Sequence, residues 1–198
     1  MYKNNYPHKR YRITLKFLKK YIDTNEEILD LGIPNPFSEI MKKNNYTVFN
    51  TQGEDLDTEF STVKKSNAST VTAFEIFEHL VAPFNVLREI KADKLIASIP
   101  LKLWFSSAYK NPNDKWDRHY HEFEDWQFDW LLEKSGWEVI SKKKWTNPTK
   151  KIGFRPILRL FFPRYYIVYA VRKPKEMSWS EKRANYEETY SKEFEKLQ

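Results

Sequence analysis

The sequence predicts an α/β fold in which a mostly parallel sheet is covered by helices on both faces. Short apolar runs that end at Gly or Pro alternate along the chain with amphipathic stretches, and this alternation is typical of a parallel sheet. The length of 198 residues suits one domain with a short tail, and 40% hydrophobic and 17% aromatic residues are ample for its core.

The expected elements follow in a regular order. Ile13, Phe17 and Tyr21 recur at four-residue spacing and indicate a helix over residues 9–22. Asn35 is a suitable helix cap, and Pro36 suits a first helical turn. We expect strands at 28–31, 46–51, 69–74, 95–99, 137–141 and 166–171, and further helices at 36–43, 83–91 and 125–134. Residues 63–67 give no clear signal, and residues 150–169 are expected to hold a core strand with a covering segment.

Composition excludes several classes of protein. The chain has no Cys, so disulfides, thiolate nucleophiles and Cys-ligated metal sites are absent. The first residues lack the apolar core of a signal peptide, and no window holds about 20 apolar residues, so we expect a cytoplasmic protein without a transmembrane segment.

The net charge of +7 is unevenly distributed. Residues 142–173 hold ten Lys and Arg without one acid, and the acidic residues gather in the middle of the chain. This pattern fits a solvated surface, and it also fits a positive field that attracts an anionic ligand.

Three strings occur in the order that one enzyme family uses. They are ILDLG at 28–32, VTAFEIFEHL at 71–80 and HYHEFEDWQFDWLLEKSGW at 119–137. Over roughly residues 10–173 the chain thereby resembles the class I S-adenosylmethionine-dependent methyltransferases of the small-molecule type. The resemblance implies a Rossmann-like fold, S-adenosylmethionine as cofactor, a methyltransferase-like domain at 1–173 and a charged C-terminal helix or tail at 174–198.

The chain departs from the family pattern in two places. Pro34 and Pro36 occupy glycine positions of the family's G-x-G-x-G loop, so this loop is degenerate and lacks two N–H donors. Only 42 residues separate Gly32 from Glu75. The family usually places two strands and a helix in this interval, so we expect the sheet to be trimmed between the first and fourth family strands.

The resemblance also implies which residues contact the cofactor. The family's first loop and fourth strand supply most of them, and its ribose-binding acid follows the second strand. Carried over, the expected cofactor-binding residues are Asp30, Gly32, Asn35, Glu54, Asp55, Phe74 and Glu75.

The acceptor side is expected to lie in the histidine-containing loop. His121 and His119 are the candidate general bases, because histidine titrates near neutral pH. Trp116, Arg118 and Tyr120 are expected to line the same pocket, with Arg155 and Arg159 as contacts for an anionic acceptor. No metal is expected, since the sequence offers no third ligand beside the two histidines.

Three functions remain open at this stage. The first is methyl transfer to a small-molecule or glycan-type acceptor, with oxygen as the acceptor atom. The second is a catalytically inactive methyltransferase-like binding or scaffold module, which the two prolines favour. The third is a basic peripheral membrane or nucleic-acid binder; nucleic acid is the weaker choice, since no recognised module is present.

Overall fold

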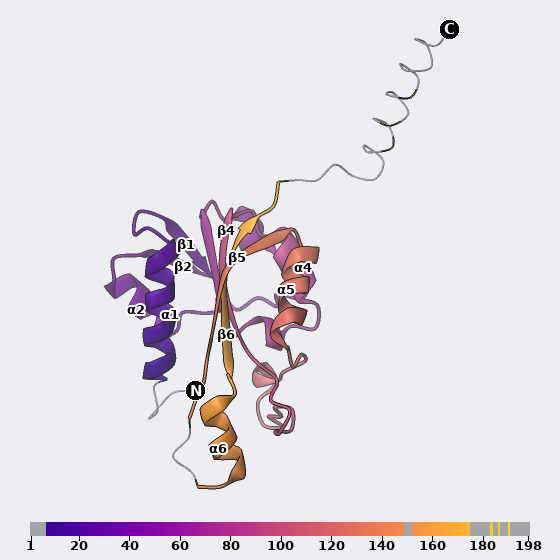
Figure 1. The fold of residues 1–198 in the computed structure, drawn as a ribbon. Coiled ribbons are helices and arrows are strands. Elements are labelled where there is room, and N and C mark those ends of the chain that lie inside the picture. Colours follow the sequence, from indigo (N-terminus) through magenta and orange to yellow (C-terminus); the bar gives the residue numbers. More distant parts are fainter. Residues whose placement is uncertain (1–6, 149–151, 175–182, 184–185, 187–189, 191–198) are drawn as a thin grey trace.

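The computed structural model describes residues 7–148 and 152–174 and the single positions 183, 186 and 190. A six-stranded sheet has the order β2-β1-β3-β4-β6-β5. Helices cover both of its faces (Figure 1). The strands are β1 (Glu27–Asp30), β2 (Thr47–Asn50), β3 (Thr70–Phe74), β4 (Lys94–Pro100), β5 (Trp137–Trp145) and β6 (Tyr165–Arg172).

Four neighbouring strands, β2, β1, β3 and β4, are parallel, whereas β6 is antiparallel to both β4 and β5. Ile28 pairs with Val48 on one side and with Thr70 on the other. The prediction of a mostly parallel α/β sheet is therefore confirmed. Because these four strands run the same way, their carboxyl ends meet at one edge, where open α/β sheets bind ligands.

The helices follow the expected positions closely, with two additions. They are α1 (His8–Tyr21), α2 (Pro36–Lys43), α3 (Ser61–Lys65), α4 (Pro83–Glu89), α5 (Asp125–Lys134) and α6 (Phe154–Phe161). The short α3 forms where the sequence gives no clear signal, and Val63 is its buried residue. One buried side chain is too little for a periodic pattern, so the burial of Val63 in the core and the contact with α4 specify this helix.

The core has two layers, one on each face of the sheet. Phe17 and Leu18 of α1 and Met41 of α2 pack on one face. Phe128 and Leu132 of α5 pack with α4 on the other. Figure 1 shows α1 and α2 on one side of the strands and α4 and α5 on the opposite side.

Strand β2 forms one edge of the sheet, and Phe49 on this strand is 53% exposed. Between β1 and β3 the chain holds only α2, β2 and α3. This is one strand fewer than the resemblance implies for the interval, as the short spacing between Gly32 and Glu75 predicts.

The structure differs from the sequence prediction at residues 150–169. The core strand is there as β6, but the preceding residues form the helix α6, none of whose residues is buried. This helix stands beyond the end of the sheet (Figure 1). The predicted helix or tail at 174–198 lies outside the described residues except Pro174, Arg183, Tyr186 and Tyr190. Among the helices of the described part, none is long and apolar enough to span a bilayer.

Candidate functional site

A cavity of about 610 Å³ opens at the carboxyl ends of β1, β3 and β4. Its walls come from the turn after β1, from α1, from the residues after β3 and from the loop between β4 and α5. Its lining is Arg10, Tyr11, Thr14, Asp30, Leu31, Gly32, Ile33, Asn35, Phe37, Phe74, Glu75, Ile76, Glu78, His79, Ser98, Pro100, Tyr109, Trp116, Asp117, His119, Arg164 and Tyr165. The volume is in the range of small-molecule and cofactor sites.

The turn after β1 requires glycine at position 32. Gly32 has a φ of +101°, and a Cβ at this position would lie 3.2 Å from Ile76 Cδ1. The Gly32 N–H donates to Thr51 Oγ1 at 2.7 Å. The glycine therefore keeps the turn close to the end of β3, and its own N–H is used inside the protein.

The buried carboxylate of Asp30 stabilises this turn through hydrogen bonds. Its side chain is 1% exposed and accepts hydrogen bonds from Thr72 Oγ1 at 2.6 Å and from Ser38 Oγ at 2.9 Å. Asn35 and Asn50 donate to the same carboxylate through their Nδ2 atoms. Burial raises the pKa of Asp30 to about 6, although these hydrogen bonds favour the charged form. Asp30 thus links β1, β2, β3 and α2.

The start of α2 is closed by a capping box. Asn35 Oδ1 accepts the N–H groups of Phe37 and Ser38, and the Asn35 N–H donates to Ser38 Oγ. Pro34 and Pro36 have no N–H. The first N–H groups of this helix are therefore already used or absent, which leaves little for a ligand anion.

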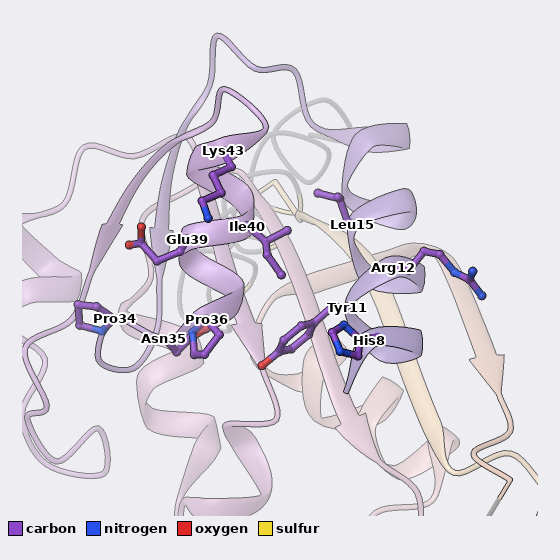
Figure 2. Close-up of a pocket in the computed structure, with 10 residues that line it drawn as sticks. All are labelled: His8, Tyr11, Arg12, Leu15, Pro34, Asn35, Pro36, Glu39, Ile40 and Lys43. Atoms are coloured by element: carbon purple, nitrogen blue, oxygen red, sulfur yellow. The ribbon is translucent and has the colours of Figure 1, made fainter. Parts of the chain in front are cut away.

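The rings of Pro34 and Pro36 line a different groove, which lies between α1 and α2 (Figure 2). Tyr11 and Ile40 contribute to this groove from the two helices. Neither proline lines the 610 Å³ cavity. The two prolines therefore shape the outer side of the turn.

Glu75, directly after β3, connects the cavity to α1. Its Oε2 accepts from Arg10 Nη1 at 3.1 Å and its Oε1 from Ser98 Oγ at 2.9 Å. Its φ of +57° is uncommon for a non-glycine residue, and such conformations gather at functional sites. Burial raises the pKa of Glu75, and the Arg10 guanidinium acts in the opposite direction.

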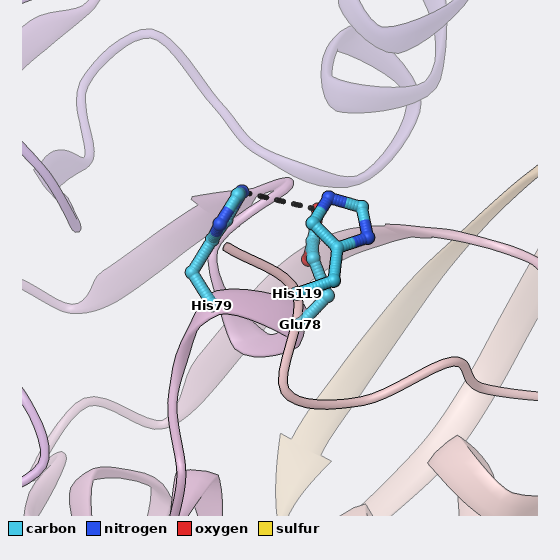
Figure 3. A group of neighbouring side chains, drawn as sticks. All are labelled: Glu78, His79 and His119. Atoms are coloured by element: carbon cyan, nitrogen blue, oxygen red, sulfur yellow. Dashed lines mark ion pairs between the residues drawn. The ribbon is translucent and has the colours of Figure 1, made fainter. Parts of the chain in front are cut away.

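A second carboxyl group, Glu78, lies deeper in the cavity wall. Its side chain is 1% exposed, and Oε2 has no hydrogen-bond partner among the described residues. Burial, followed by the negative charge of Glu75, holds the pKa of Glu78 well above its usual range. Two histidines surround it: His79 Nε2 is 3.8 Å from Glu78 Oε1, and the His79 and His119 rings meet edge to face at 4.8 Å (Figure 3).

Hydrogen bonds fix the loop before α5 over this cluster. The backbone N–H groups of Tyr120 and His121 donate to the Glu78 carbonyl oxygen at 2.8 and 3.2 Å. His121 Nε2 lies 3.1 Å from the Val81 carbonyl oxygen. His119 therefore faces the cavity, and the ring of His121 is bonded outside it. Burial, and then the nearby His79, lower the pKa of His119, which favours a neutral imidazole.

The cavity brings together seven of the residues that the sequence singled out. They are Asp30, Gly32, Asn35, Phe74, Glu75, Trp116 and His119. Seven others lie outside its lining: Glu54, Asp55, Arg118, Tyr120, His121, Arg155 and Arg159.

Arg10, Ser98, Glu78 and Arg164 also line the cavity, and none of them was expected at the site from the sequence. Arg10 is one of seven bases in the first twenty residues, so nothing in the sequence separates it from solvated neighbours. Glu78 could have been found from the sequence, because it stands three residues after Glu75 in the string at 71–80, which most resembles the family.

Solved structures share this architecture at low sequence identity. A methyltransferase from Burkholderia thailandensis, 1,6-didemethyltoxoflavin-N1-methyltransferase with bound 1,6-didemethyltoxoflavin and S-adenosylhomocysteine, is 13% identical with a TM-score of 0.58. The match covers 83% of this chain and 78% of that one. A SAM-dependent methyltransferase from Methanosarcina mazei is 10% identical with a TM-score of 0.53, over 80% and 98% of the two chains.

The [4+2]-cyclase SpnF is also similar, at 12% identity and a TM-score of 0.55, over 88% of this chain and 85% of that one. No protein-family model and no curated protein matches the sequence. The chain therefore has the class I methyltransferase fold. The cyclase carries the same fold under a different activity, so function has to be argued from the site.

Proposed function

We propose that this chain is an S-adenosylmethionine-dependent methyltransferase that acts on a small-molecule or glycan-type acceptor, with oxygen as the acceptor atom. The cavity at the carboxyl ends of β1, β3 and β4 is the observation that supports it, because it joins the Gly32 turn and Glu75 to the His119 loop in one space. These are the parts that the resemblance assigns to cofactor and acceptor.

The residues present fit the charges of S-adenosylmethionine. Glu75 and the ring of Phe74 suit a sulfonium cation, and Arg10 suits a carboxylate. Side chains would supply most of these contacts, since the N–H groups of Gly32 and Asn35 are used within the protein. When bound, the cofactor supplies the electrophilic methyl group.

The ribose hydroxyls are assigned to the turn after β2. Gly53 lies against the Gly32 turn, because a Cβ on Gly53 would be 3.1 Å from Ile33 Cγ2. Glu54 and Asp55 follow directly. We propose Glu54 or Asp55 as the contact for the ribose or the adenine, although neither residue lines the 610 Å³ cavity.

The chain's own contribution to methyl transfer is mainly orientation. Holding donor and acceptor in line supplies about 7–11 kcal/mol, and a general base adds roughly 10²–10⁴-fold. We assign the contact with an acceptor hydroxyl to His119, because His119 lines the cavity and a neutral imidazole can accept the hydroxyl proton. Arg164, which also lines the cavity, is a cation within reach of an anionic acceptor.

Titration calorimetry with S-adenosylmethionine and S-adenosylhomocysteine tests the cofactor assignment. We expect both ligands to bind. Mass spectrometry of hydroxylated acceptors incubated with the protein and cofactor then tests oxygen as the acceptor atom. If neither ligand binds, the inactive binding module becomes the better description, as the closed capping box at Asn35 favours.

A second function is favoured by α6, namely docking on an anionic membrane surface. Phe154, Ile157 and Phe161 are 69%, 55% and 72% exposed. Arg155 and Arg159 lie on the same short helix. An exposed apolar face with arginines beside it is typical of an interfacial helix. Docking through this helix is compatible with a ligand bound in the cavity.

A further inference from the structure

The cluster of Glu78, His79 and His119 joins two segments that lie 40 residues apart. Glu78 and His79 belong to the 3₁₀ turn Phe77–His79, and His119 comes from the loop before α5. One ligand-type atom from each side chain lies within 4.8 Å of the other two. Figure 3 shows the three side chains next to one another, and all three line the cavity.

Glu78 has an oxygen without a partner. The side chain is 1% exposed and lines the cavity, and Oε2 receives no hydrogen bond from the described residues. An unsatisfied buried carboxyl oxygen destabilises the folded protein, so such groups call for an explanation. A cation at Oε2 would remove this cost.

His79 has its ring oriented as in metal-bound histidines. Its Nδ1 lies 3.0 Å from the Arg118 carbonyl oxygen, which can only accept a hydrogen bond. Nδ1 therefore carries the proton, and the lone pair of the neutral ring is on Nε2, which faces Glu78. A backbone carbonyl that fixes the tautomer of a histidine is the usual outer partner of a metal ligand.

His119 supplies the third ligand atom. Its Nδ1 is buried and has no hydrogen-bond partner among the described residues, although Glu122 Oε1 lies 3.7 Å from it. The ring is held between His79 at 4.8 Å and Tyr109 at 4.4 Å. The hydrogen bonds from Tyr120 and His121 to the Glu78 carbonyl oxygen keep this loop next to Glu78.

We propose that Glu78, His79 and His119 bind a divalent transition-metal ion of the zinc or iron(II) class. Two imidazoles and one carboxylate suit these ions, whereas magnesium prefers oxygen ligands alone. In a tetrahedral zinc site with bonds near 2.1 Å the ligand atoms lie about 3.4 Å apart, so modest side-chain rotations close the site. The remaining coordination positions face the cavity, where an oxygen ligand such as a hydroxylated acceptor can bind.

Binding of the ion needs no cofactor, so the proposal can be tested apart from methyl transfer. This site could not be predicted from the sequence, because the sequence suggested His121, two residues away, as the neighbour of His119. In the structure the ring of His121 is hydrogen-bonded to the Val81 carbonyl oxygen instead. The partners of His119, which are Glu78 and His79, precede β4 in the chain, whereas His119 follows it. If an ion occupies the site, His119 acts as a ligand and the acceptor's proton goes to another base.

The test uses the untagged chain of residues 1–198. The chain is first stripped of metal with a chelator and then titrated calorimetrically with Zn²⁺ and with Mg²⁺ in the absence of cofactor. We expect one Zn²⁺ per chain and weaker binding of Mg²⁺. Glu78→Gln, His79→Asn and His119→Asn should each weaken Zn²⁺ binding at least roughly 10-fold, the lower end of what even outer-sphere changes cost. His121→Asn is the matched control and should bind like the wild type.

Co²⁺ titration of the wild type provides a second measurement that does not depend on any variant folding. A visible absorption band saturating at one ion per chain, displaced by Zn²⁺, supports the site. The proposal is overturned if the wild type gives neither Zn²⁺ heat nor a Co²⁺ band, or if folded Glu78→Gln and His119→Asn proteins bind Zn²⁺ as tightly as His121→Asn. Since no cofactor is present, this outcome leaves the methyltransferase proposal untouched.

Discussion

Arg10 on the first helix donates from Nη1 to Glu75 Oε2 across 3.1 Å, although the two residues lie 65 positions apart in the chain. The side chains are only 16% and 15% exposed. This ion pair fixes the start of α1 over the end of β3, and thereby forms one wall of the cavity.

Arg10→Met should destabilise the fold by about 2–3 kcal/mol, because it leaves the mostly buried Glu75 carboxylate with Ser98 as its one hydrogen-bond donor among the described residues. The double variant Arg10→Met/Glu75→Gln should lose less than the sum of the two single changes. Urea denaturation measures all three free energies of unfolding. Arg12→Met, at an exposed position on the same helix, is the control; an equal loss there would show that the pair itself contributes little.

The stability contributed by Asp30 should depend on pH. Its pKa is raised to about 6 in the folded protein, so the folded state holds the proton more tightly than the unfolded chain. This contribution is present below about pH 4 and is lost as pH rises through 6, and it amounts to about 3 kcal/mol. Other buried carboxyls also titrate, so the measured quantity is the difference in unfolding free energy between the wild type and Asp30→Asn. A difference that stays constant from about pH 4 to 7 would contradict the assignment.

Gly32→Ala should impair both stability and cofactor binding. The φ of +101° and the approach of Ile76 each disfavour a Cβ, and the left-handed conformation alone costs about 1–2 kcal/mol. Gly136→Ala is a matched control, because Gly136 also has a positive φ, of +89°, but lies outside the cavity. Denaturation should show losses in both variants, and calorimetry with S-adenosylmethionine should show weaker binding in Gly32→Ala alone. Equal affinities would move the cofactor away from this turn.

Replacing Pro34 and Pro36 together by Gly should strengthen binding of S-adenosylmethionine. The change adds two N–H donors at the turn and at the first position of α2, where the capping box leaves few. Stability should fall by about 0.4–1 kcal/mol per site, because the unfolded chain gains freedom. Calorimetry measures the affinity, and an unchanged value would show that the prolines do not limit it.

Membrane docking through α6 should depend on both its apolar face and its arginines. Vesicle cosedimentation with anionic phosphatidylglycerol should decrease strongly in Ile157→Asp/Phe161→Asp, and added salt should weaken wild-type binding. Arg155→Gln/Arg159→Gln should lose about 1 kcal/mol per arginine. Trp130→Asp serves as the control, since Trp130 is 65% exposed but lies on α5. Binding to neutral vesicles that matches binding to anionic ones would refute an electrostatic role.

Local patterns in the sequence determined most of the fold. The spacing of Ile13 and Phe17, the cap at Asn35 and the apolar run Ile28–Leu31 each specify an element through neighbours a few residues away. The order of the three sequence strings at 28–32, 71–80 and 119–137 then predicted a mostly parallel sheet. These signals are short in range, and the strands and main helices appear where they predict.

Only the tertiary structure decided the site. Arg10 meets Glu75, and His119 meets His79, because parallel strands deliver their carboxyl ends to one edge and loops fold over it. Glu78 is likewise buried by the tertiary fold, and the residues next to it in the sequence do not predict this burial. Pairings between distant segments leave no periodic pattern in the chain, so the sequence alone could propose His119 for the site without naming its partners.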